Sequence, residues 1–172
     1  MARDRERDHR ALPRLRGDVL ACIYDGWCHV GCPIGALANP LVTYLADARK
    51  AGATYVADWI NDDQPYLMHV GGKRLCSIPY SGEINDLPQI LRAGRSSDEF
   101  ERMICRQFDT LYREGAQSGR VMAICLHPFV IGVPHRIGAL DAALAYILRH
   151  EGVWCATGSE IIEHYLASGA TF

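Results

Sequence analysis

Two apolar runs of the sequence end in residue types that can take part in chemistry. "YVADW" ends in Asp58 and Trp59, and "AICLH" ends in His127. A histidine can give a proton to a departing group, and a nearby carboxylate can orient its imidazole ring. If both runs are strands of one parallel sheet, their carboxyl ends meet at the same edge. We therefore expect Asp58 and His127 to form a catalytic pair.

Each of these residues also has a structural interpretation. His127 could be a buried histidine that only satisfies local hydrogen bonds, and Asp58 could accept bonds from the backbone of its loop. Trp59 could belong to the core, as large aromatic residues beside strand ends usually do. The residue types alone leave both interpretations open.

The stretch "NDDQPY" carries more polar groups than a turn requires. We expect Asp62, Asp63 and Tyr66 to line the mouth of a substrate site. The alternative is a turn that is rich in side chains able to bond their own backbone. Glu83, Asn85 and Asp86 of "SGEINDLP" have the same two interpretations.

His135 and Arg136 open a predicted helix, where the helix dipole does not favour a cation. This placement favours a bound anion or a carboxylate partner, so both residues are candidates for substrate binding. The alternative is that both lie on the surface.

The sequence alternates between strand-like and helix-like periods. Continuous apolar runs predict strands, and apolar stripes with capping residues predict helices. The predicted strands cover 18–25, 54–59, 74–80, 120–127 and 153–157. The predicted helices cover 39–52, 96–119, 134–152 and 158–169. Ser97 and Ser159 serve as start signals for the second and last helices. Alternating strands and helices with apolar strands indicate a parallel α/β fold.

Composition excludes several classes of protein. The chain has 172 residues, 49% of them hydrophobic, and a formal net charge of -2, which suits one soluble globular domain. This charge balance does not indicate nucleic-acid binding, which needs an excess of basic residues. No apolar run reaches the length of about 20 residues that spans a bilayer. The start, "MARDRERDHRALPRLRGD", has no apolar signal core, so we expect a cytoplasmic protein.

The cysteines favour a reducing compartment and not a metal centre. There are seven, an odd number, and most lie in apolar runs. Cys28 and Cys32 flank His29 in "CHVGC", but no second pair with zinc-ligand spacing follows. We therefore expect no metal in this chain.

Four stretches together resemble the polysaccharide deacetylase superfamily, also called the NodB-homology family. They are "YVADWINDDQPY", "IPYSGEINDLP", "GRVMAICLHPFVIGVPHRIGALDAALAYI" and "GVWCATGSEI". The nearest branch looks like the cytoplasmic one with cofactor-independent allantoinases and peptidoglycan deacetylase-like proteins. The resemblance implies a distorted (β/α) barrel that hydrolyses amide C–N bonds of a saccharide or small molecule. It implies that His127 protonates the leaving amine, that Asp58 tunes His127, and that Trp59 walls the substrate groove.

The chain departs from the family in its upstream motifs. The family's Asp-Asp strand end and its His-x-x-x-His pair, which supply the general base and a divalent-metal site, do not occur. Gly26-Trp27 resembles the third motif, but Cys28 stands where the family has an Arg. We therefore expect the C-terminal half of the barrel in residues 36–172, behind a charged leader and unassigned strand in residues 1–35. Any metal would be bound by the missing half, so no cofactor is expected in this chain.

Three functions remain open from the sequence. The first is a truncated hydrolase of the deacetylase and allantoinase kind. The second is a non-catalytic fragment or binding half that needs a partner chain. The third is an unrelated small α/β protein. Because half a barrel exposes strand edges, we expect a homo-oligomer or a complementing chain.

Overall fold

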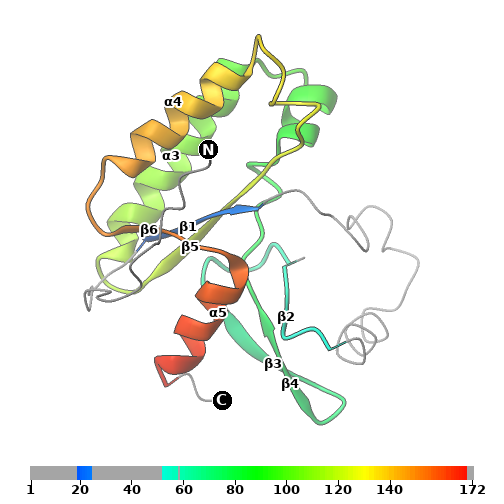
Figure 1. The fold of residues 1–172 in the computed structure, drawn as a ribbon, viewed down its shortest axis with the longest axis vertical. Helices are drawn as coiled ribbons and strands as arrows, with labels where there is room; N and C mark the ends of the chain where they lie inside the picture. The colour runs from blue at the N-terminus through cyan, green and yellow to red at the C-terminus, as the bar shows by residue number, and fades with distance from the viewer. Residues whose placement is uncertain (1–18, 25–51, 58, 170–172) are drawn as a thin grey trace, which may run out of the picture.

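The main sheet of the protein has three parallel strands. The computed structural model describes residues 19–24, 52–57 and 59–169 (Figure 1). In this sheet β1 (Val19–Tyr24) is the middle strand, between β5 (Arg120–Cys125) and β6 (Val153–Cys155). Both neighbours of β1 run parallel to it. The parallel α/β prediction is confirmed for this sheet.

A second, small sheet has the order β2-β4-β3. Its central strand β4 (Lys73–Ser77) pairs in parallel with β2 (Tyr55–Val56) and antiparallel with β3 (Tyr66–Val70). The turn between β3 and β4 is Gly71-Gly72, and both glycines have positive φ, 56° and 76°. Two glycines suit the tight turn of a hairpin, because that turn needs positive φ angles, which other residues rarely adopt.

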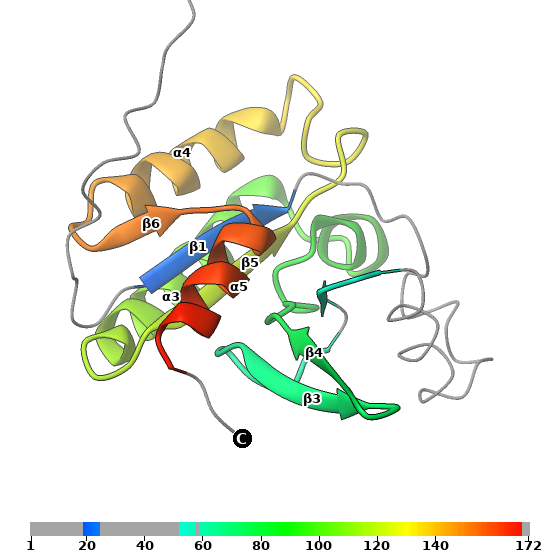
Figure 2. The ribbon, with the colours of Figure 1, turned by 60° about the horizontal axis from the view of Figure 1, so that its bottom comes forward.

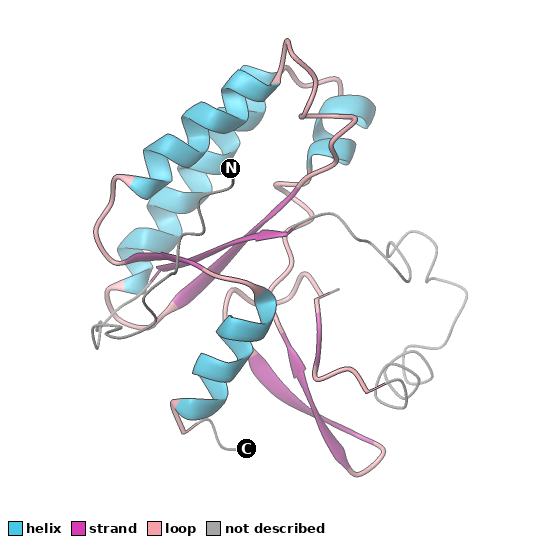
Figure 3. Cartoon of the chain, viewed as in Figure 1, coloured by secondary structure: helices cyan, strands magenta, loops and turns pink. Residues whose placement is uncertain are grey.

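Helices cover both faces of the main sheet. α3 (Ser97–Gly115) and α4 (Ile137–Leu148) pack against each other on one face. α5 (Gly158–Ala167) lies on the other face, beside the small sheet (Figure 2). A short π-helix, η1 (Leu87–Arg92), follows the small sheet and precedes α3 (Figure 3).

β5 is apolar along its length because side chains pack on both of its faces. Met122 and Ile124 belong to a core cluster with Phe108 of α3 and Ile147 of α4. Val121 belongs to a second cluster, which contains Ile161 and Ile162 of α5 and Cys76 of β4. Strands covered on both faces read as continuous apolar runs, which is why this strand could be predicted from sequence.

Most predicted elements are confirmed, with shifted ends. The strands predicted at 18–25 and 120–127 are β1 and β5, and the three helices predicted from residue 96 onward are α3, α4 and α5. Two start signals were wrong by one or two positions. Ser96 caps α3 and Thr157 caps α5, each in a reciprocal capping box with Glu99 or Glu160. The helix predicted at 39–52 lies outside the described residues.

Two elements were not predicted. β3 makes the small sheet mixed, so the expectation of an all-parallel arrangement was wrong there. η1 was also missed, because its "LPQILR" sequence has a proline in the first turn and few turns to show a period.

Among residues 19–24, 52–57 and 59–169 the strands form two separate sheets and no closed barrel. β1, which the sequence predicted as an unassigned strand within 1–35, is hydrogen-bonded between two strands from the 36–172 part. The division into 1–35 and 36–172 stays a prediction. In the part of the chain that is described, none of the helices is long and apolar enough to cross a membrane.

Candidate active site

His127 lies just beyond the carboxyl end of β5. The strand ends at Cys125, and the buried run from Val121 to Cys125 holds that end firmly in the core. The His127 side chain is 30% exposed, so the ring is anchored on one side and open on the other. Parallel α/β proteins bind their substrates at the carboxyl ends of their strands, and the His127 ring lies at such an end.

The partner of His127 is Asp86, which is fully buried at 0% exposure. The backbone N–H of His127 donates to Asp86 Oδ2 at 2.7 Å, and His127 Nδ1 lies 2.6 Å from Asp86 Oδ1. Both carboxyl oxygens are therefore used by one residue. A buried carboxylate needs such partners because its own desolvation is costly.

This arrangement orients the imidazole. An ionised carboxylate only accepts hydrogen bonds, so with Asp86 in that form His127 Nδ1 carries the proton and donates the hydrogen bond to Asp86 Oδ1. The other ring nitrogen, Nε2, is left for a ligand on the exposed side. Such a pair fixes the ring orientation and tautomer of a proton-transferring histidine.

Phe129 packs against the same ring. Its centroid lies 5.5 Å from that of His127 with the rings 67° apart, and its side chain is 67% exposed. Edge-to-face contact at this distance is favourable for aromatic rings. Phe129 thus forms an apolar wall next to His127, and the sequence reasoning did not single it out.

The predicted partner of His127, Asp58, lies outside the described residues. Trp59 packs with Val70 and Leu75 in a small cluster of the second sheet, and its indole Nε1–H is buried without a hydrogen-bond partner. Roles for Asp58 and Trp59 in catalysis and substrate binding stay predictions. Asp86 was noted only as an ambiguous polar residue, because its distance in sequence from His127 hides the contact.

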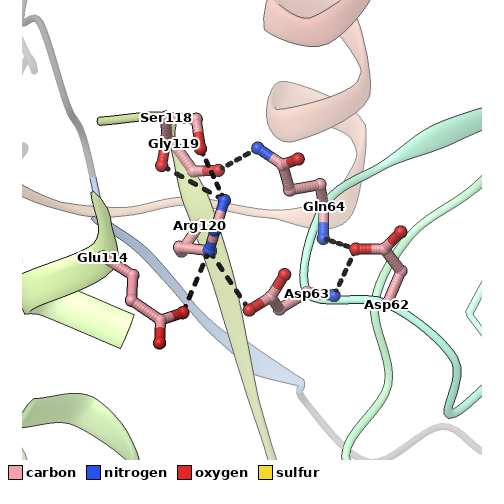
Figure 4. A network of polar contacts seen from close by, with 7 residues as sticks. All are labelled: Asp62, Asp63, Gln64, Glu114, Ser118, Gly119 and Arg120. Atoms are coloured by element: carbon pink, nitrogen blue, oxygen red, sulfur yellow. Dashed lines mark hydrogen bonds and ion pairs between the residues drawn. The ribbon is translucent and has the colours of Figure 1, made fainter. Parts of the chain in front are cut away.

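The "NDDQPY" stretch lies at the other end of β5. Asp62 Oδ1 accepts the backbone N–H groups of Asp63 and Gln64, and the Gln64 amide donates to the Gly119 carbonyl at 2.8 Å (Figure 4). The Arg120 guanidinium lies 3.2 Å from Asp63 Oδ2. These contacts fasten the loop to the connection between α3 and β5.

This placement separates the loop from His127. The backbone N–H of Val121 donates to the Asp63 carbonyl, so Asp63 lies beside the first residues of β5. His127 is seven residues beyond Arg120, or roughly 20 Å along an extended strand. Tyr66 accepts a bond from the Asn61 amide at 2.9 Å. The structure gives Asp62, Asp63 and Tyr66 structural contacts, and their predicted role in substrate binding stays a prediction.

His135 and Arg136 lie just before α4, whereas the sequence predicted both inside the first turn of a helix over 134–152. Arg136 is the N-cap residue without a side-chain cap bond, and its guanidinium donates to the Val130 carbonyl at 3.1 Å. That bond ties the loop after His127 to the helix start. His135 is exposed. A role in substrate binding for either residue stays a prediction.

A cavity of about 340 Å³ lies between α3 and the loops 60–63 and 79–83. Asp62, Asp63, Tyr80 and Glu83 line it, whereas His127 does not. Across the described residues, no group of three or more His, Cys, Asp or Glu side chains could hold a metal ion.

Comparison with known proteins shows which proteins the chain resembles. No family model matches the chain. A Schizosaccharomyces pombe protein named "Putative polysaccharide deacetylase" is 34% identical over 122 residues, which are 64% of this chain and 38% of that protein. The crystal structure of Puue allantoinase superposes with a TM-score of 0.71 at 31% identity, over 78% of this chain and 45% of the other.

The chain belongs, as a partial domain, to the polysaccharide deacetylase and allantoinase-like family. A second crystal structure, of a "probable Polysaccharide deacetylase" from Pseudomonas aeruginosa PAO1, has a TM-score of 0.70 at 29% identity and covers 77% of this chain and 45% of its own. The suspected resemblance is thus confirmed at the level of the family. The chain spans less than half the length of these relatives.

Proposed function

We propose that this chain carries the proton-donating side of an amide-hydrolysing site of the deacetylase and allantoinase kind. The observation that supports the proposal is the His127–Asp86 pair: a partly exposed imidazole on a fully buried carboxylate, just beyond the carboxyl end of the parallel strand β5. Within the family, a histidine at this position of "AICLHPF" is expected to serve as the general acid.

The geometry suits protonation of a departing nitrogen. Hydrolysis of an amide passes through a tetrahedral intermediate, and its C–N bond breaks readily only if the nitrogen receives a proton. His127 would give the proton from Nε2, its open side. Asp86 would keep the ring in place and stabilise the positive charge of the protonated imidazole, as a buried carboxylate beside a histidine can do.

The rest of the site must come from outside the described residues. The relatives are more than twice as long as the matched part of this chain, which supports the view that it is one half of a (β/α) barrel. The general base that activates water would lie in the other half. The names of the relatives suggest two substrate classes, N-acetylated saccharides and cyclic ureides, both of which contain an amide C–N bond.

A second candidate is a non-catalytic half that binds a partner chain or a saccharide. One observation supports it: the chain covers only 38% to 45% of its relatives. A lone proton donor contributes a factor of roughly 10²–10⁴ to a rate, which is small beside a complete site.

The test is a hydrolysis assay with a matched variant. The chain, alone and mixed with the unmatched part of the Pseudomonas aeruginosa protein, would be incubated with an N-acetylated chito-oligosaccharide and with allantoin. His127→Gln removes the proton donor, and His69→Gln changes an exposed strand residue of the small sheet as the control. Released amine or ureide product is measured over time.

The proposal expects hydrolysis in the mixture, a fall of at least about 10²-fold in His127→Gln, and no such fall in His69→Gln. Hydrolysis that does not depend on His127 would contradict it. If neither the chain nor the mixture hydrolyses either compound, the non-catalytic candidate is favoured.

A further inference from the structure

We propose that Asn85 is a positioning residue for the His127–Asp86 pair, anchored by the hydroxyl group of Tyr80. This inference deepens the proposed function and rests on it. Asn85 does not touch His127. It holds the backbone on both sides of Asp86, so that the carboxylate meets two donors of His127 at once.

The backbone of Asn85 is aligned with the end of β5. Asn85 forms a parallel bridge with Cys125, and the Cys125 N–H donates to the Ile84 carbonyl at 3.0 Å. This pairing sets the register between the segment that carries Asp86 and the strand that carries His127. Because Asp86 follows Asn85 and His127 lies two residues past Cys125, a slip here would separate the pair.

The side chain of Asn85 is used at both of its polar ends. Its Nδ2 donates to Tyr80 Oη at 2.9 Å, and its Oδ1 accepts the Leu87 N–H at 3.1 Å. The first contact joins Asn85 to a residue before Asp86 in the sequence, and the second joins it to the residue directly after Asp86. Together they restrict the backbone that presents the Asp86 carboxylate.

The Leu87 contact also leaves the Asp86 side chain without a capping role. Asp86 is the N-cap residue of η1, where an aspartate usually accepts a first-turn N–H group. Its side chain makes no such cap bond. Asn85 takes the cap role at Leu87, so both Asp86 oxygens are available to His127, at 2.6 and 2.7 Å.

The Tyr80 contact links the pair to the loop after β2. The Tyr80 N–H donates to the Trp59 carbonyl at 3.3 Å, and the Tyr80 hydroxyl receives the Asn85 amide. The sequence predicted a direct link between Asp58, after β2, and His127, and that link stays a prediction because Asp58 lies outside the described residues. Among the described residues, a link runs from Trp59 through Tyr80 and Asn85 to the backbone beside Asp86.

The experiment reads the tautomer of His127 by nitrogen NMR in the full chain labelled with ¹⁵N-histidine, in buffer well above pH ~6.5, the ordinary pKa of histidine. The His127→Gln spectrum assigns the signal. Asn85→Ala removes both side-chain contacts, and Tyr80→Phe removes only the anchoring oxygen. Asn61→Ala is the matched control, because the Asn61 amide also donates to a tyrosine hydroxyl, that of Tyr66, at 2.9 Å.

We expect the wild type to have its proton mainly on Nδ1. In Asn85→Ala and Tyr80→Phe the ratio of Nδ1–H to Nε2–H should fall roughly two- to tenfold, the worth of one neutral hydrogen bond. Asn61→Ala should leave the ratio unchanged. A purely structural role would lower thermal stability without moving the ratio, so unfolding curves are recorded for each variant.

Each result has one meaning. If folded Asn85→Ala and Tyr80→Phe keep the wild-type ratio, the positioning role is wrong while the His127–Asp86 pair stands. If Asn61→Ala shifts the ratio equally, the effect is not specific and the role is also wrong. If the wild type has its proton on Nε2, the pair itself is wrong and the proposed function loses its support. Should Asn85→Ala fail to fold, Tyr80→Phe decides.

Discussion

At the scale of single residues, the account rests on one buried carboxylate. Sequence reasoning found His127, because a histidine directly after an apolar run stands out. It did not find Asp86, because 41 residues separate the two and "EINDLP" offers several polar candidates. The contact arises from the pairing of Asn85 with Cys125, which no local pattern encodes. The carboxylate partner of His127 is thus fixed by tertiary register.

Asp86→Asn tests this residue directly. The amide keeps the size of the side chain but replaces one acceptor oxygen with a donor, which would face a donor of His127. We expect a loss of about 1–3 kcal/mol in the free energy of unfolding, the cost of a mispaired buried polar group. Urea unfolding measures it. Asp141→Asn, an exposed change on α4, should cost far less, and equal losses would contradict the role of burial.

At the scale of elements, helix starts show how far sequence patterns reach. The long amphipathic stripe of α3 predicted the helix, whereas the first serine of "SSDEFE" and not the second is its cap. Ser96 accepts the Glu99 N–H, and Glu99 accepts the Ser96 N–H at 2.8 Å and its hydroxyl at 3.0 Å. The capping-box spacing Ser-x-x-Glu fits Ser96 with Glu99 and not Ser97, which Phe100 follows at that spacing, so this signal was present in the sequence and was missed.

Ser96→Ala should therefore lower the free energy of unfolding by about 0.5–2 kcal/mol through loss of the cap. Ser97→Ala is the matched control, since Ser97 is the first residue inside the helix and not its cap. Thermal or urea unfolding compares the two. A larger loss in Ser97→Ala than in Ser96→Ala would show that the cap is wrongly placed.

The same cap predicts a pH dependence. Hydrogen bonds from the Ser96 backbone N–H and then from its hydroxyl lower the pKa of Glu99 below its ordinary value of 4.5. A carboxyl group with a lowered pKa stabilises the fold fully above that ordinary value, and the contribution is lost as the pH falls through the folded pKa. The stability difference between the wild type and Glu99→Gln should thus be constant above pH 4.5 and shrink below it. A difference that grows on acidification would contradict the cap.

The loop that follows β2 is fastened by its own polar groups. Asp63 pairs with Arg120, but the Asp63 side chain is 38% exposed, and ion pairs at such sites contribute little. Asp63→Asn should change the free energy of unfolding by less than about 1 kcal/mol and leave the His127 tautomer as in the wild type. The tautomer is read by the same NMR signal. A shifted tautomer would connect this loop to the site after all.

At the scale of the whole molecule, the alternating strands and helices predicted an α/β fold, and that is what forms. The mixed small sheet was not predicted, although "VGGK" between two apolar runs is a hairpin signal. Barrel closure could not be predicted from local patterns, because it depends on which strands pair with one another across the whole sheet, and the described strands form two separate sheets.

Open sheet edges predict association. Among the described strands, β2, β3, β5 and β6 each pair with only one other strand of their sheet. Unpaired strand edges tend to pair with another chain. Sedimentation velocity on the chain alone should show species larger than a monomer, and the unmatched part of the Pseudomonas aeruginosa protein should compete with that association. A stable monomer across micromolar concentrations would contradict this expectation.

The most direct test of the central claim is the tautomer of His127 in the wild-type chain and in Asp86→Asn, read from the nitrogen NMR signals of its ring. The account predicts a proton on Nδ1 in the wild type, held by the buried Asp86 carboxylate, and a shift of that proton to Nε2 when the amide takes its place. A wild-type ring protonated on Nε2, or a tautomer that is the same in the wild type and in Asp86→Asn, would contradict the claim that Asp86 prepares His127 to act as the proton donor.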